Sequence, residues 1–200
     1  MMEKKIFDAF IEANHSIIEK IAEEATILHD VDCNQKYSDK PYSYHLGKVA
    51  DYAIKYGHLV CVDEKYIIPI IFGAWFHDAI EDARMTYNDI LKLSKRFMDN
   101  ELATVATEIV YALTDEKGRT RKERGSEKHY EDIRNTLYAP FVKWCDRIAN
   151  LMYSIENESR MADVYLGELD DFYRKMGGNE SIPEDLWNLM FKWKINYETK

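Results

Sequence analysis

The most restrictive feature of this sequence is an apolar run over residues 67–76, IIPIIFGAWF, which leads directly into His77 and Asp78. The run is too short to span a bilayer, and its near-continuous apolar character is typical of a buried central helix. Pro69 fits the first turn of that helix, because proline is tolerated there. We expect the helix to continue to Asp82. The run therefore predicts a central helix of a folded domain.

Helical spacing of apolar residues also dominates the rest of the chain. No alternating strand pattern of useful length appears, and the 8 glycines and 4 prolines leave few turn-rich stretches. The 200 residues fit one domain. The sequence therefore predicts a single all-α domain over residues 1–200. Helices are expected over about residues 4–29, 43–56, 86–98 and 100–113, and again after a polar segment at 115–128.

The charge of the chain limits its partners. The net charge is −9 and the sequence pI is near 5.2. An acidic surface repels duplex nucleic acid and anionic membranes. It does not exclude a small phosphorylated ligand in a local basic pocket, and a small-molecule nucleotide is the partner we expect.

Cysteine usage and the N-terminus indicate a compartment. The three cysteines are scattered and form no CxxC pair, which fits free thiols in a reducing cytoplasm better than a disulfide framework. The first residues, MMEKKIFDAFIEANHS, lack the apolar run of a signal peptide. We therefore expect a cytoplasmic protein.

Four side chains form a candidate metal site. Asp78 follows His77 at the end of the apolar helix, where an unpaired carboxylate is costly to bury. A divalent cation would supply its partner, and His45 and Asp146 lie in helical segments of the same kind. Imidazole and carboxylate together suit Mn²⁺, Fe²⁺ or Zn²⁺, and we expect one ion, Mn²⁺. The alternative is that the two histidines are hydrogen-bonded core residues and that Asp146 caps a helix or forms an ion pair.

The order His, His-Asp, Asp on three helices resembles the HD superfamily of metal-dependent phosphohydrolases. Within it, three segments are similar to motifs of RelA/SpoT-type alarmone hydrolases, which remove the 3′-pyrophosphate from guanosine tetra- and pentaphosphate. The resemblance covers about residues 36–153 and implies an HD-type helical bundle. The segments are PYSYHLGKVA, FHDAIEDARMTYNDI and VKWCDRIANL. The chain is too short to hold the synthetase domain of bifunctional members, so we expect hydrolysis only.

Glu81 and Asp82 are the candidate catalytic residues. On a helix, Glu81 lies one turn beyond His77 and Asp82 one turn beyond Asp78. Both carboxylates would then project near the metal and could orient or deprotonate the attacking water. The alternative is a solvated helix end that carries two acids, which is disfavoured because negative charge is unfavourable at a helix C-terminus.

Candidate substrate contacts come from three places. Asn150 lies one turn beyond Asp146, and the resemblance implies a position beside the nucleoside. The basic segment 115–128 could clamp phosphates or be only a solvated loop. The family's guanine-contacting RKD stretch is replaced by QKYSDK, so adenine is as plausible as guanine, and Leu46 replaces the family's proline. The candidate residues are Lys36, Tyr37, Lys40, Arg119, Arg121, Arg124 and Asn150.

Two other functions keep the same site. One is an HD-type nucleotidase that acts on a nucleoside monophosphate or deoxynucleotide. The other is a catalytically silent nucleotide-binding regulatory module, which the intact ligand set and the Glu81-Asp82 pair disfavour. Hydrolysis of ppGpp or ppApp is the first hypothesis.

Overall fold

Helices make up nearly all the regular structure, as the apolar spacing predicts. The computed structural model describes residues 1–115, 120, 123 and 125–198. Its α-helices are α1 (Lys4–Ala13), α2 (His15–Thr26), α3 (Ser43–Tyr56), α4 (Ile67–Phe76), α5 (Tyr87–Ser94), α6 (Asn100–Leu113), α8 (Glu127–Asn135), α9 (Ala139–Glu156), α10 (Met161–Gly167), α11 (Leu169–Lys175) and α12 (Glu184–Glu198). A π-helical turn (Ile27–Asp32), three 3₁₀ turns (Gly57–Leu59, Glu64–Tyr66 and Gly178–Glu180) and two strands, β1 (Lys36–Tyr37) and β2 (Lys40–Pro41), complete the described elements. The all-α prediction is confirmed.

Some helix boundaries differ from the sequence-based expectation. The expected helix over residues 4–29 is two helices with a break at Asn14, whose side-chain amide donates to the Phe10 carbonyl at 2.9 Å. Asparagine competes for backbone carbonyls in this way, which explains the break. Strands β1 and β2 form a small antiparallel hairpin between α2 and α3, where no strand was expected. The helix expected over 86–98 ends at Ser94 and continues only as tight turns to Phe97.

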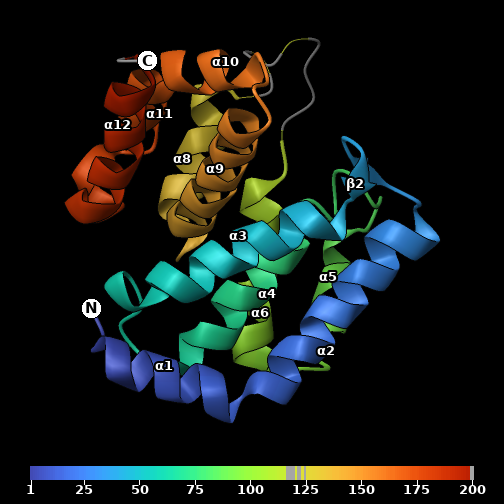
Figure 1. The fold of residues 1–200 in the computed structure, drawn as a ribbon. Helices are drawn as coiled ribbons and strands as arrows, with labels where there is room; N and C mark the ends of the chain where they lie inside the picture. Colours follow the sequence, from blue (N-terminus) through green and yellow to red (C-terminus); the bar gives the residue numbers. More distant parts are fainter. Residues whose placement is uncertain (116–119, 121–122, 124, 199–200) are drawn as a thin grey trace.

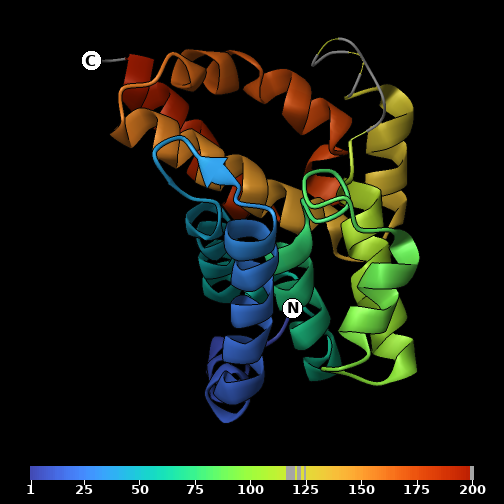
Figure 2. The same cartoon turned by 90° about the vertical axis from the view of Figure 1, so that its right-hand side faces the viewer.

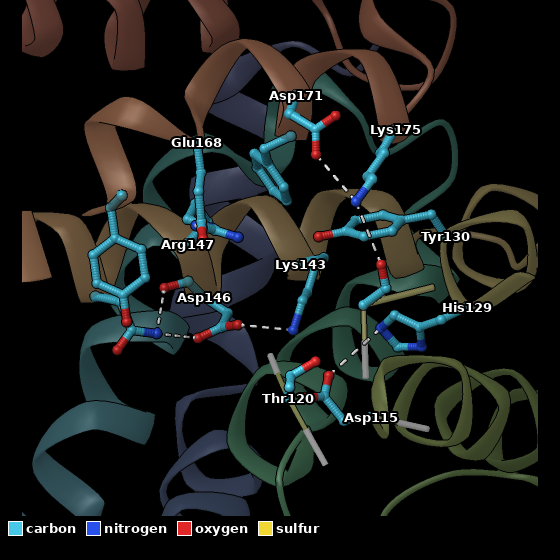
Figure 3. A pocket seen from close by; sticks show the side chains of 14 residues that line it. Asp115, Thr120, His129, Tyr130, Lys143, Asp146, Arg147, Glu168, Asp171 and Lys175 are labelled. Atoms are coloured by element: carbon cyan, nitrogen blue, oxygen red, sulfur yellow. Dashed lines mark hydrogen bonds and ion pairs between the residues drawn. The ribbon is translucent and has the colours of Figure 1, made fainter. Parts of the chain in front are cut away.

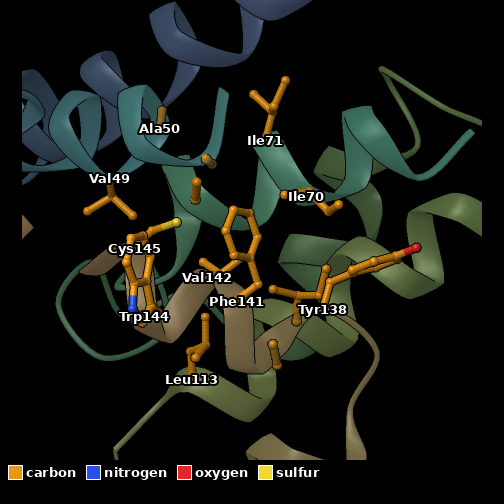
Figure 4. Close-up of a cluster of buried hydrophobic side chains, with 14 of the residues drawn as sticks. Val49, Ala50, Ile70, Ile71, Leu113, Tyr138, Phe141, Val142, Trp144 and Cys145 are labelled. Carbon is orange, nitrogen blue, oxygen red and sulfur yellow. The ribbon is translucent and has the colours of Figure 1, made fainter. Parts of the chain in front are cut away.

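Helix α4 lies at the centre of the core, as the apolar run predicts. Each of its residues except Trp75 is buried, and it packs against α2, α3, α6 and α9. The approach to α6 is close: a Cβ on Gly73 would lie 2.6 Å from Cγ2 of Ile109. Figure 4 shows side chains of α3, α4, α6 and α9 meeting in this core, with Phe141 and Val142 in the middle. This packing holds the end of α4 rigidly against α3 and α9.

The helices are arranged around α3, α4, α6 and α9. Figures 1 and 2 show α1 and α2 at one end of the molecule and α10, α11 and α12 at the other. The β1–β2 hairpin lies beside the start of α3 (Figure 1). Among the described helices, none has the length and apolar character that crossing a membrane would require.

Candidate metal centre

Three elements bring the four predicted ligands together. His45 lies in the first turn of α3, and Asp30 fixes that turn by accepting hydrogen bonds from the Ser43 amide at 3.0 Å and the Ser43 hydroxyl at 2.5 Å. His77 and Asp78 follow the last residue of α4 directly, and Asp146 lies in the middle of α9. The His29-Asp30 dipeptide, which precedes His77-Asp78 in the sequence, therefore stabilises the start of α3 through its aspartate.

The donor atoms of these residues converge on one small volume. Nitrogen and oxygen atoms of His45, His77 and Asp146 all lie within 4.8 Å of one another, a grouping that could hold a metal ion. The two Nε2 atoms are 3.3 Å apart, and Oδ1 of Asp146 lies 3.4 Å from His45 and 3.7 Å from His77. Oδ2 of Asp78 approaches the same atoms, at 3.1 Å from Nε2 of His77 and 3.8 Å from that of His45. The structure thus brings together the predicted set.

The orientation of His77 leaves its Nε2 available for a ligand. Its Nδ1 lies 2.9 Å from the Ala74 carbonyl, which assigns the Nδ1 proton to that hydrogen bond. The Nε2 atom then faces Asp78 and Asp146. Metal-binding histidines are held in this way by a hydrogen bond through the second ring nitrogen.

The electrostatics of the cluster favour a cation. Burial alone would lower the pKa of His77, but the carboxylates of Asp78 and Asp146 raise it to about 10. Burial alone would raise the pKa of both carboxylates. The neighbouring histidines nevertheless hold the pKa of Asp78 below its ordinary range. Lys143, and then the histidines, hold the pKa of Asp146 below its ordinary range. Two partly buried carboxylates therefore share positive partners here. A divalent cation meets the same demand, because two imidazole nitrogens and two carboxylate oxygens suit Mn²⁺, Fe²⁺ or Zn²⁺.

A hydroxyl joins Asp78, a predicted metal ligand, to the predicted catalytic residue Asp82. Tyr42 Oη lies 2.7 Å from Oδ2 of Asp78 and 2.7 Å from Oδ2 of Asp82. The Tyr42 ring stacks on the buried His29 with centroids 5.2 Å apart. The Gln35 side chain in turn contacts Nδ1 of His29 at 2.5 Å and donates to the Asp82 carbonyl at 2.6 Å. These contacts hold Asp82 beside the metal ligands.

The backbone that carries Glu81 and Asp82 is a turn, where a continuing helix was expected. Helix α4 ends at Phe76, and the Asp82 amide donates to the Asp78 carbonyl at 2.8 Å, which retains the one-turn spacing of these two residues. The Met85 amide then reaches back to the Ala79 carbonyl at 3.2 Å, past a left-handed residue, Arg84 (φ 58°). The left-handed conformation at Arg84 turns the chain away from the helical path, which prevents the helix from continuing.

The surroundings of Glu81 favour its role as a proton acceptor. Its carboxylate accepts a hydrogen bond from the Asp115 amide at 3.4 Å. Partial burial, followed by the charges of Asp115 and Asp78, raises the pKa of Glu81 above its ordinary value. A carboxylate with a raised pKa beside a metal site is suited to general acid–base chemistry.

Tyr37 and Asn150 form a chain of contacts to the metal ligands. The Tyr37 hydroxyl donates to Oδ1 of Asn150 at 2.8 Å, and the Asn150 amide donates to Oδ1 of Asp146 at 2.5 Å. The Tyr37 ring stacks on His45 with centroids 4.7 Å apart. Both residues were predicted to contact substrate, and here they also orient Asp146 and His45.

No contact with the candidate metal site is seen for the other described residues that were predicted to bind substrate, Lys36 and Lys40. Lys36 is exposed on the hairpin, and Nζ of Lys40 lies 4.8 Å above the Tyr44 ring. Arg119, Arg121 and Arg124 fall outside the described residues, as do Lys117 and Lys122 of the same basic segment.

A cavity of about 520 Å³ opens beside Asp146. Figure 3 shows that its wall combines residues of α8, α9 and α11, with Lys143, Asp146 and Arg147 on α9. The volume lies within the range of small-molecule sites. Sequence reasoning did not single out its basic and aromatic lining, although Lys143 lies three residues before Asp146 and so shares its helix face. The principal members of this lining are His129, Tyr130, Lys143, Arg147, Tyr165, Phe172 and Lys175.

The chain matches no protein-family model, no curated protein and no solved structure in comparisons with these three sets. What the site can do is therefore inferred from its own side chains and their geometry.

Proposed function

We propose that this protein is a divalent-metal-dependent phosphohydrolase of the HD type, which removes the 3′-pyrophosphate from an alarmone-type purine nucleotide, ppGpp or ppApp. The observation that carries the proposal is the convergence of donor atoms from His45, His77, Asp78 and Asp146. These residues come from three separate elements, yet the Nε2 atoms of the two histidines lie 3.1–3.8 Å from each other and from the carboxylate oxygens. The order in which they occur along the chain is the one that the HD resemblance requires.

A bound Mn²⁺ ion would polarise the phosphoryl group and lower the pKa of a water molecule at this site. The side chains of the protein then have distinct tasks. Glu81 has a raised pKa and can accept the proton of the attacking water. Asp82 is held through Tyr42 to the ligand Asp78 and can orient the same water. The ligand candidates His45 and His77 are buried, which keeps the position of the ion largely out of bulk water and strengthens electrostatic effects there.

The cavity beside Asp146 supports a substrate larger than phosphate alone. It is lined by cationic side chains and by aromatic rings, among them Tyr130 and Tyr165, on which a base could stack. A nucleotide could thus place its phosphoryl end at Asp146 and its nucleoside within the cavity. The altered QKYSDK hairpin leaves the choice between guanine and adenine open.

The test is a turnover assay across a nucleotide panel with the Mn²⁺-loaded protein. The panel contains ppGpp, ppApp, the 5′-triphosphates, 5′-monophosphates and deoxynucleotides, and a His77→Ala variant serves as the metal-free control. We expect pyrophosphate release from ppGpp, ppApp or both, poor cleavage of 5′-triphosphates, and no turnover in the variant. Release of single phosphates from 5′-monophosphates, with 3′-pyrophosphates untouched, would instead identify a nucleotidase. Alarmone binding without cleavage at full metal occupancy would favour a regulatory module.

A further inference from the structure

Lys143 connects the candidate metal centre to the cavity. It lies on α9, one helical turn before Asp146, and its side chain is 16% exposed. Its Nζ is 3.2 Å from Oδ2 of Asp146, whereas Oδ1 of the same carboxylate faces His45 at 3.4 Å. Lys143 also lines the cavity (Figure 3). One carboxylate therefore separates the ammonium group from the position of the ion.

The other two strongly basic side chains of the described cavity wall have acidic partners outside the metal centre. Arg147 forms an ion pair with Glu168 at 3.0 Å and lies 4.4 Å from the centroid of the Phe172 ring. Lys175 forms an ion pair with Asp171 at 3.0 Å. Their charges are compensated whether or not a metal ion is bound. Lys143 differs, because its partner is a predicted metal ligand.

Metal binding changes the charge balance around Lys143. Asp78 and Asp146 together carry two negative charges, which a divalent ion neutralises. The ammonium group of Lys143 then has less compensation from Asp146, although Asp115 also lies close enough to raise the pKa of Lys143. Two N–H bonds of the ammonium group remain for other acceptors. An anionic ligand of the ion, at the mouth of the cavity, would supply both the charge and the acceptors.

We propose that Lys143 binds a non-bridging oxygen of the metal-bound phosphoryl or pyrophosphoryl group and so fixes the anion between the metal ion and the cavity. This inference rests on the proposed function for the identity of the substrate, but the anion contact itself requires no turnover. A charge-assisted hydrogen bond from a lysine to phosphate is among the stronger polar contacts in proteins. Lys143 is thus a substrate-binding residue in addition to a partner of Asp146.

The experiment measures binding of inorganic pyrophosphate to the Mn²⁺-loaded protein by calorimetry. Lys143→Met removes the charge and the donors, and Lys143→Arg retains both. Lys143→Gln also removes the charge but keeps a polar side chain, and it replaces the Met variant if that variant does not fold. We expect Lys143→Met and Lys143→Gln to keep one Mn²⁺ per chain and to bind pyrophosphate at least roughly tenfold more weakly, equal to about 1.4 kcal/mol. Lys143→Arg should retain most of the affinity.

Lys4→Met is the control, because it removes an exposed lysine of α1 that lies outside the cavity and forms an ion pair with Asp8. Its pyrophosphate affinity should stay within about threefold of that of the wild type, a smaller change than the roughly tenfold loss expected for Lys143→Met. The inference is overturned if the Lys143 variants lose Mn²⁺, which would limit Lys143 to orienting Asp146, or if they bind pyrophosphate as tightly as the wild type. A wild-type protein that cleaves no nucleotide but shows the Lys143-dependent affinity would refute the proposed function and leave this inference standing.

Discussion

Removal of the metal ion should destabilise the fold by a measurable amount. An ion held by His45, His77, Asp78 and Asp146 links α3, the end of α4 and α9. These residues are far apart in the sequence, so the unfolded chain has no equivalent site, and binding adds to the free energy of unfolding. At a free metal concentration about 100 times the dissociation constant, the gain is about 2.7 kcal/mol.

That free energy corresponds to a clear shift of the melting temperature. For a chain of 200 residues, 1 kcal/mol changes Tm by roughly 2–4 °C. Saturating Mn²⁺ should therefore raise Tm by about 5–11 °C over protein treated with a chelator. Differential scanning calorimetry, with and without Mn²⁺, measures this shift directly.

An isosteric variant tests whether the shift comes from this site. Asp78→Asn keeps the shape of the side chain and an acceptor for Tyr42, but it removes the charge that an ion requires. Asp51→Asn, an exposed position on α3, is the matched control and should show the wild-type shift. The reasoning is refuted if Mn²⁺ raises the Tm of Asp78→Asn as much as that of the wild type.

Three further predictions follow from single contacts. Glu81→Gln should bind Mn²⁺ and nucleotide nearly as the wild type does but lose most turnover, roughly 100-fold or more; unchanged kcat would remove Glu81 from the mechanism. Tyr42→Phe keeps the ring but loses the hydroxyl that joins Asp78 to Asp82, so kcat should fall at least about tenfold with metal content retained, and an unaltered kcat would show that this bridge has no catalytic role. Gly73→Ala would place a Cβ 2.6 Å from Cγ2 of Ile109, and overpacking of this kind costs roughly 1–3 kcal/mol; a Tm equal to or above that of the wild type would show that α4 and α6 separate easily.

The parts of the fold that local spacing determines could be predicted from the sequence. The apolar run identified α4 as the central helix, and the segments over residues 43–56 and 100–113 match α3 and α6. The candidate metal set could be proposed from the sequence because its members follow or begin apolar helical segments and because their order resembles that of a known family; the structure groups His45, His77 and Asp146 where they could hold an ion. The hydrogen bond of Asn14 to its own helix and the left-handed turn at Arg84 were not predicted, since both depend on competition between local backbone conformations.

The contacts between distant segments could not be predicted in the same way. Tyr37 reaches Asn150 across 113 residues of sequence, and it stacks on His45 because the β1–β2 hairpin folds back onto α3. The cavity beside Asp146 depends on how α8 and α11 pack against α9. Lys143 is the exception, because its position three residues before Asp146, on the same helix face, can be read from the sequence.

The most direct test of the metal centre is the manganese content of the purified, Mn²⁺-loaded protein, measured by elemental analysis for the wild type and for His77→Ala. His77 is 2% exposed and contributes a nitrogen 3.3 Å from that of His45, so its loss removes a ligand that no neighbouring water can replace with equal affinity. We predict one Mn²⁺ per wild-type chain and no stoichiometric Mn²⁺ in the variant. Full metal occupancy in His77→Ala would contradict the assignment of this site.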